Sequence, residues 1–348
     1  MKADANTLAD QVIAGDRRAL ARAITVVESD RADHRANALR LIEAAQASGR
    51  QALRIGLSGT PGVGKSTFIE AFGMHLIDRG LRVAVLAVDP SSARTGGSIL
   101  GDKTRMDRLV RQPGAFIRPS PSRSTLGGVA RRTREAILLV EAAGYDVVLI
   151  ETVGVGQSET MVAGMSDIFT LLIGPGGGDE LQGVKRGIME IADIVLVNKA
   201  DGALKPVAER TRADYAAALR LMRRAGDGPK GFPCVLTTSA LENTGVSAAW
   251  EQMQALADWR RGHGVWDRTR AEQARLWFEE DLRAGLLARL TADPDLATQM
   301  AALGDQVQAG RTAPSAAAAA LLNHLAAGEK KRLTPVLTPF TARTKPGL

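Results

Sequence analysis

A glycine-rich segment near the start of the chain has the residue types that bind phosphate. Residues 59–66 read GTPGVGKS, which matches G-x-x-x-x-G-K-[ST], and they lie between the apolar run LRIGLS and the helical segment TFIEAFGMHLIDRG. Glycines allow backbone N–H groups to surround phosphate oxygens, and the amino end of a helix favours negative charge. The predicted nucleotide-binding residues here are Gly59, Thr60, Pro61, Gly62, Val63, Gly64, Lys65, Ser66 and Thr67.

Charged and hydroxyl side chains in and near this segment suit phosphoryl transfer. Lys65 is expected to bridge the β- and γ-phosphates and to stabilise charge in the transition state. Ser66 offers a hydroxyl to Mg²⁺, and two acids end apolar runs elsewhere: Asp89 after RVAVLAV and Glu151 after DVVLI. Hard oxygens suit Mg²⁺, so Ser66, Asp89 and Glu151 form the predicted metal site. For Asp89, a helix cap or turn is the alternative.

The segment after Glu151 and a polar tract before it supply further candidates. Gly154, in ETVGVGQSE, suits a close backbone approach to the γ-phosphate because it has no side chain. Asp102 lies in the glycine- and serine-rich tract 91–114 and is the acid there predicted to position water or metal, with a surface cap as the alternative. Loops of this composition beside a phosphate site are expected to order with nucleotide.

A second pair of loops indicates which base is bound. Residues 198–201 read NKAD and end the apolar run DIVLV. A carboxylate at Asp201 can accept from the N1–H and amino groups of guanine, whereas adenine offers neither donor there. Lys199 can lie over the base, and Asn198 can connect this loop to the phosphate loop. Ser239, Ala240 and Leu241 follow the next apolar run and can present backbone N–H groups to guanine O6.

Short apolar runs must position these loops. From Leu53 on, seven of them alternate with helical segments: LRIGLS, RVAVLAVDP, AFIRPS, DVVLIET, DIFTLLIGP, DIVLVNKAD and FPCVLTTSA. Nearly continuous apolar strands suit a parallel sheet buried on both faces, and the alternation indicates crossover helices. We predict an α/β fold, a P-loop NTPase domain over residues 51–255 with a mainly parallel sheet flanked by helices.

Helical extensions are expected on both sides of this domain. Residues 1–50 place Leu8, Val12, Leu20, Ile24 and Val27 at near-helical spacing. Residues 256–348 are predicted to form a helical arm and an extended tail, and the helical pattern there comprises Leu276, Phe278, Leu282, Leu286 and Leu290. The aromatic residues of this region, Trp259, Trp266, Trp277 and Phe278, would either cap the α/β domain or contribute to a dimer contact.

Composition excludes several classes of function. The 348 residues carry a net charge of +7, but the basic residues are scattered and form no nucleic-acid-binding run. One cysteine excludes an internal disulfide or a cysteine-based metal cluster, and the four histidines lack ligand spacing. No apolar run reaches membrane-spanning length. We therefore expect a cytoplasmic protein with neither a nucleic acid nor a membrane as partner.

In combination, the motifs resemble one family. GTPGVGKST, VDPSS, ETVGVGQSE, GGGDELQG, NKAD and TSAL, in this order, are similar to the MeaB/ArgK family of GTPases. The resemblance covers about Leu53 to Trp250. It implies an Mg²⁺-dependent homodimeric GTPase that converts GTP to GDP, gates the loading of adenosylcobalamin into methylmalonyl-CoA mutase and protects that enzyme. It also implies that the tract 174–185, which ends at Lys185, is a switch loop that contacts the mutase; a long turn before a helix is the alternative.

Two other functions remain open at this point. A metallochaperone GTPase for another metalloenzyme shares the general motif order, although such proteins usually carry His-rich or Cys-containing metal motifs. A non-enzymatic switch with negligible turnover would show the same nucleotide motifs. Because no glutamine or arginine lies beside Gly154, we expect slow intrinsic hydrolysis that a partner accelerates, with Lys185 as the coupling cation.

Overall fold

The computed structural model describes residues 5–29, 31–88, 106–119, 126–152, 158–176, 186–222 and 228–330. The chain divides into two compact units, residues 1–277 and residues 278–348. The first unit contains the whole β-sheet and the loops of the predicted nucleotide site.

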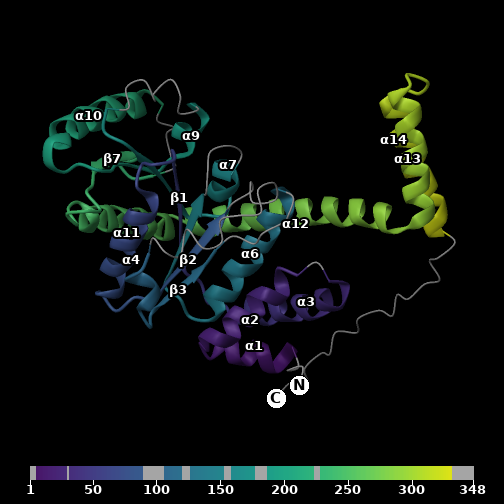
Figure 1. Ribbon diagram of the computed structural model, residues 1–348, viewed down its shortest axis with the longest axis horizontal. Helices are drawn as coiled ribbons and strands as arrows, with labels where there is room; N and C mark the ends of the chain where they lie inside the picture. The colour runs from purple at the N-terminus through teal and green to yellow at the C-terminus, as the bar shows by residue number, and fades with distance from the viewer. Residues whose placement is uncertain are drawn as a thin grey trace, which may run out of the picture. The chain divides into compact units, whose positions relative to one another are not determined.

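A seven-stranded parallel sheet forms the centre of the first unit (Figure 1). Its strands are β1 (Leu53–Gly59), β2 (Val83–Val88), β3 (Ala115–Arg118), β4 (Val147–Thr152), β5 (Ile168–Ile173), β6 (Ile194–Val197) and β7 (Cys234–Thr237). The spatial order is β3-β2-β4-β1-β5-β6-β7, and every neighbouring pair is parallel. Each of the seven predicted runs corresponds to one strand, so the predicted fold class is confirmed.

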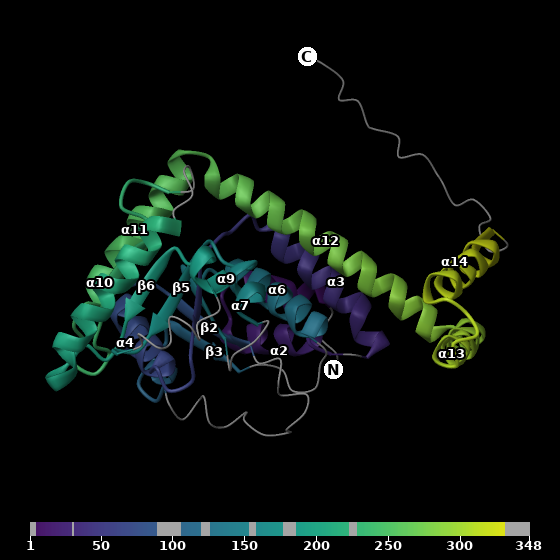
Figure 2. The ribbon, with the colours of Figure 1, turned by 90° about the horizontal axis from the view of Figure 1, so that it is seen from above.

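The sheet is buried on both faces because alternate side chains enter two separate hydrophobic clusters. On β4, Val148 and Ile150 join one cluster, while Val147 and Leu149 join the other. The first face is covered by α6 (Leu126–Ala142), α7 (Ser158–Ala163), α9 (Arg186–Ile191) and α10 (Lys205–Met222). The second is covered by α4 (Lys65–Ile77), the short helix η2 (Leu109–Arg111) and α11 (Val246–Gly262), and Figure 2 shows both layers.

Three aspartates fix how neighbouring strands align at their amino-terminal ends. Each directly precedes a strand, and its carboxylate accepts a hydrogen bond from a backbone N–H of the adjacent strand or its approach. The pairs are Asp146 with Arg82 at 2.7 Å, Asp167 with Arg54 at 2.8 Å and Asp193 with Phe169 at 2.8 Å. Since a shift by one residue would break these bonds, they specify the strand register.

The N-terminal region forms three helices that pack on α6. They are α1 (Ala5–Ile13), α2 (Arg17–Val27) and α3 (Ala32–Ala47). The five residues expected on their apolar faces, Leu8, Val12, Leu20, Ile24 and Val27, are all buried. The carboxylate of Asp16 caps α2, and the N–H groups of Ala19 and Arg18 lower its pKa.

The helix α12 (Val265–Ala292) begins in the first unit. Trp266 is buried against the cluster beneath α4 and α11, and Trp277 packs against the cluster on the other face. Trp266 donates from Nε1 to the side chain of Gln51 at 3.1 Å. Of the two alternatives for these aromatic residues, capping of the α/β domain therefore applies to Trp266 and Trp277.

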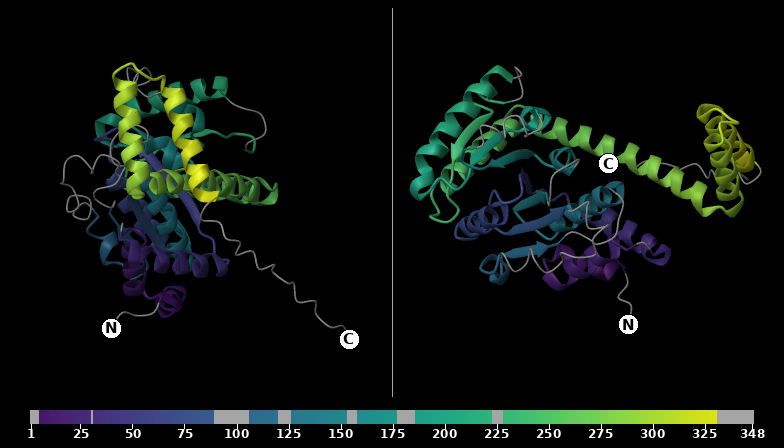
Figure 3. Two further views of the ribbon diagram at one scale, coloured as in Figure 1. Left: turned by 90° about the vertical axis from the view of Figure 1, so that its right-hand side faces the viewer. Right: turned by 45° about the horizontal axis from the view of Figure 1, so that its top comes forward.

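The second unit contains the remainder of α12, α13 (Pro294–Gln308) and α14 (Pro314–Lys330). Figure 3 shows α13 and α14 side by side, and Leu290, Leu296 and Leu321 form their small core. The other apolar residues of α12 in this unit are exposed, namely Phe278, Leu282, Leu286 and Leu287. Among the described residues, no helix combines the length and apolar character needed to cross a membrane.

Candidate functional site

The phosphate loop connects the carboxyl end of β1 to the first residue of α4. Gly59 has a φ of +154°, and a Cβ there would lie 2.3 Å from the carbonyl oxygen of Leu172 on β5. Gly64, with a φ of +92°, would place a Cβ 2.8 Å from the side-chain nitrogen of Asn198. Only glycine fits these two positions, because the backbone is left-handed or the neighbouring atoms are too close.

The side chain of Lys65 turns back over this loop. Its Nζ donates to the carbonyl oxygens of Gly59 at 2.6 Å and Thr60 at 3.2 Å. The ammonium group is therefore held above the backbone that would surround the phosphates. The bridging of the β- and γ-phosphates by Lys65 stays a prediction from the sequence.

Ser66 and Glu151 come together at the ends of α4 and β4. The hydroxyl of Ser66 donates to Oε1 of Glu151 at 3.3 Å, and Glu151 is only 3% exposed. Glu151 lies beside β1 because it pairs in register with Leu57. A hydroxyl and a carboxylate at this separation are hard oxygen donors that fit Mg²⁺.

Asn198 joins the phosphate loop to the loops expected to bind the base. Its Nδ2 donates to the carbonyl oxygens of Val63 at 3.0 Å and Gly64 at 3.4 Å. Its Oδ1 accepts from the hydroxyl of Thr238 and from the backbone N–H of Ala240, both at 3.4 Å. Asn198 thus connects the two loops, as expected from the sequence.

The remaining residues of the base loop lie beside this joint. Lys199 has a φ of +61°, and its Nζ donates to the carbonyl oxygen of Gly62 at 2.6 Å, which draws the side chain along the phosphate loop. The hydroxyl of Ser239 donates to Oδ2 of Asp201 at 2.5 Å, so this bond engages one of the two carboxylate oxygens. The side chain of Leu241 is exposed, so this residue can contribute only through its backbone or at the rim.

One polar pair at the site was not predicted. The hydroxyl of Thr152 donates to that of Ser58 at 3.2 Å, and both residues are buried. The pair joins the last residue of β4 to the second-last residue of β1. The only sequence signal was a hydroxyl residue near the end of each apolar run.

Four predicted site residues lie outside the described residues. They are Asp89, Asp102, Gly154 and Lys185. Within the described part of the chain, no group of three or more His, Cys, Asp or Glu side chains is placed to hold a metal ion. Cys234 is half-buried at the start of β7, and burial raises its pKa to about 12, so its side chain is a thiol at neutral pH.

A cavity lies away from the phosphate loop, at the amino-terminal ends of β5 and β6. Its volume is about 720 Å³, and side chains of α7, α9, α11 and α12 line it. The described loops that follow β1 and β6 lie instead at the carboxyl ends of the strands, where open parallel sheets bind their ligands.

A parallel sheet of this order, with a phosphate loop between its central strand and the following helix, defines a P-loop NTPase. The family described as "Methylmalonyl Co-A mutase-associated GTPase MeaB" matches residues 20–295. The chain belongs to this family of GTPases.

Relatives of known name support this assignment. GTPase ArgK of Escherichia coli is 49% identical over 281 residues, which cover 81% of this chain and 84% of that protein. The mouse methylmalonic aciduria type A homolog, a mitochondrial protein, is 44% identical over 89% of this chain and 77% of its own length. The crystal structure of an LAO/AO transport system kinase matches with a TM-score of 0.72 and 37% identity, covering 94% of this chain and 99% of that one.

We expect Asp201→Asn to change the base preference. Ser239 donates to one oxygen of the residue, so the substituted amide would turn its NH₂ group toward the base. In guanine, this NH₂ donor would face another donor, the N1–H. In xanthine, it can donate to the O2 oxygen. Calorimetry should show GDP binding weakened by about 1.5–3 kcal/mol and binding of the xanthosine nucleotide strengthened. Glu242→Gln, in the same loop region, is the control, and an unchanged preference for GDP would contradict the base-reading role.

Proposed function

We propose that this chain is an Mg²⁺-dependent, cytoplasmic GTPase that acts as a chaperone for methylmalonyl-CoA mutase. It would gate the loading of adenosylcobalamin and protect the mutase from inactivation. The GTPase part of the proposal is supported by Asn198, which connects the phosphate loop to the NKAD loop. The mutase part is supported by the description of the family as mutase-associated. The Asn198 joint would hold the loop that binds the base in a fixed position relative to the loop that binds the phosphates.

The roles of the individual residues follow from their positions. The backbone of residues 59–66 would bind the phosphates, and Lys65 would stabilise negative charge on the transferring phosphoryl group. Ser66 and Glu151 would hold Mg²⁺, which supplies charge neutralisation at the phosphates when bound. Asp201 would select guanine. The metallochaperone alternative would be supported by a cluster of metal-binding side chains, and the described residues contain no such group of His, Cys, Asp or Glu.

The metal role of Glu151 can be measured by magnesium titration of GTP hydrolysis. Glu151→Gln should raise the half-saturating Mg²⁺ concentration by about tenfold or more, because an amide is a weaker ligand for a hard cation. Lys65→Ala should instead lower the maximal rate by about 100-fold at saturating Mg²⁺. A wild-type midpoint for the Glu151 variant would remove this residue from the metal site. A wild-type protein without turnover would favour the non-enzymatic switch.

Partner control is the second part of the proposal. We expect slow hydrolysis by the isolated protein and faster hydrolysis with the cognate mutase, because an incomplete site is completed on docking. Lys185→Ala should leave the basal rate nearly unchanged and remove most of the stimulation. Lys205→Ala, an exposed lysine at the start of α10, is the matched control. Equal stimulation of the Lys185 variant and the wild type would exclude Lys185 as the coupling residue.

A homodimer completes the proposal, and the exposed apolar side chains of α12 support it. Leu282 and Leu286 are 50% and 44% exposed, one helical turn apart. The double substitution Leu282→Glu and Leu286→Glu should yield a monomer in light scattering without unfolding the protein. Leu221→Glu, at a position on α10 that is 90% exposed, is the control. A double variant that remains dimeric would place the contact elsewhere.

A further inference from the structure

The turn between α7 and β5, residues 164–167, is held from one side by α12. Nε2 of Gln273 donates to the carbonyl oxygen of Ser166 at 2.8 Å. Arg270 binds the carboxylate of Asp167 through two N–H groups, Nε to Oδ1 at 2.8 Å and Nη2 to Oδ2 at 2.6 Å. Gln273, Ser166 and Asp167 are each at most 6% exposed, so these bonds are shielded from water.

From the other side, the same turn contacts β1. The backbone N–H of Arg54 donates to Oδ2 of Asp167 at 2.8 Å. Further along the strand, Gly56 faces the turn so closely that a Cβ would lie 2.3 Å from the hydroxyl oxygen of Ser166. The turn is therefore enclosed between α12 and the strand that leads into the phosphate loop.

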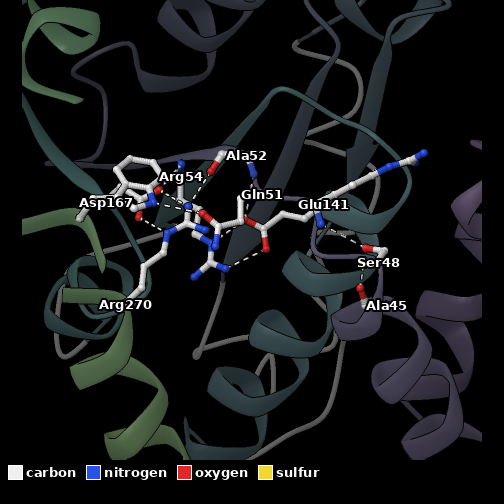
Figure 4. A network of polar contacts seen from close by, with 10 residues as sticks. Ala45, Ser48, Gln51, Ala52, Arg54, Glu141, Asp167 and Arg270 are labelled. Carbon is white, nitrogen blue, oxygen red and sulfur yellow. Dashed lines mark hydrogen bonds and ion pairs between the residues drawn. The ribbon is translucent and has the colours of Figure 1, made fainter. Parts of the chain in front are cut away.

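A second pair of buried charges completes this contact (Figure 4). The guanidinium of Arg54 binds Glu141 of α6 at 2.9 and 2.7 Å. Arg270 reaches the carbonyl oxygen of Ala52 at 2.6 Å, while the N–H of Ala52 donates to Glu141 at 3.1 Å. Residues 52–54, at the start of β1 and directly before it, are thus bonded to both α6 and α12.

These contacts involve two elements connected to the phosphate site: β1, which leads into the phosphate loop, and α7, which follows the strand that carries Glu151. β1 ends at Gly59, roughly 17 Å from Arg54 at about 3.3 Å per residue. α7 follows β4, whose last residues are Glu151 and Thr152. The position of the turn therefore sets where β1 and α7 lie with respect to each other.

We propose that Gln273 and Arg270 are positioning residues for GTP hydrolysis, acting through the turn at residues 164–167. The inference rests on the proposed function, because it assumes hydrolysis at the phosphate loop. The hydrogen bonds of both side chains go to the turn and to Ala52, at the end of the strand opposite to the phosphate loop. Their effect is to fix β1 and α7 in the relative placement that the reaction requires. A displacement of about one ångström lowers the rate of a reaction strongly, whereas nucleotide binding tolerates it.

The test separates the rate of hydrolysis from nucleotide affinity. Gln273→Met keeps the shape of the side chain and removes its hydrogen bond, and Arg270→Lys keeps the charge but cannot bind both carboxylate oxygens in the same way. In the full chain, both variants should lower kcat by about tenfold and leave KM and the Kd for GDP within about twofold of wild type. Amide hydrogen exchange at residues 164–167 should become faster in both.

Matched controls use the same substitutions elsewhere. Gln254→Met changes an exposed glutamine on α11. Arg261→Lys changes an arginine whose guanidinium also lies 4.3 Å from the ring centre of Trp266, as that of Arg270 does, but whose ion pair with Asp258 is exposed. Both controls should retain wild-type kcat and exchange.

Three results would overturn the inference. Wild-type kcat in Gln273→Met and Arg270→Lys would overturn the inference alone and leave the proposed function intact. A loss of GDP affinity equal to the loss of kcat would indicate general damage to the site, and would also overturn it. A wild-type protein without GTP turnover would overturn the proposed function and this inference together.

Discussion

The carboxylate of Asp167 is the point at which three parts of the fold are joined. It accepts from the backbone of β1 and from Arg270 of α12, while the backbone oxygen of the same residue accepts from Arg260 of α11. Removing a carboxylate from water costs several kcal/mol, so this arrangement is favourable only when every partner is in place. Strand, turn and helices must therefore assemble in one relative arrangement.

The charges around Asp167 balance within a small volume. Arg54 and Arg270 face Asp167 and Glu141, two cations and two anions, all with side chains no more than 10% exposed. Burial lowers the pKa of Arg54, but the hydrogen bond and charge of Glu141 more than reverse this and raise the pKa above its ordinary value. The guanidinium of Arg54 is therefore charged at neutral pH.

How far the sequence predicts this structure depends on the kind of contact. The seven strands follow from apolar runs, because a sheet buried on both faces requires them. The Asn198 joint could be expected because the phosphate and base loops must meet at one sheet edge. The contact face of α12 could not be expected from apolar periodicity. The pattern of Leu276, Phe278, Leu282, Leu286 and Leu290 predicts a helix, and α12 is present there. Within the first unit, however, the residues of α12 that contact the sheet domain are Trp266, Arg270, Gln273 and Trp277.

The reason is the surface that α12 covers. The amino-terminal ends of parallel strands present backbone N–H and C=O groups and the aspartates that cap them, so the complementary helix face must be polar and aromatic. Trp277 shows this combination, since the guanidinium groups of Arg54 and Arg134 lie 5.7 and 5.6 Å from the centre of its ring. A search for aliphatic residues at helical spacing overlooks such a face, although Trp266, Arg270, Gln273 and Trp277 also recur at intervals of three and four.

Stability alone does not account for this buried cluster. Well-packed apolar residues of similar volume often replace a buried ion pair at no cost, or even with a gain. What apolar packing does not supply is direction, because a bidentate arginine fixes both the distance and the plane of the carboxylate that it binds. At the opposite end of β1, the Ser58–Thr152 pair and the close approach of Gly59 to Leu172 are equally intolerant of displacement. A strand that must present a phosphate loop to within a fraction of an ångström gains from directional bonds at both ends, which favours orientation as the reason that charged residues occupy this part of the core.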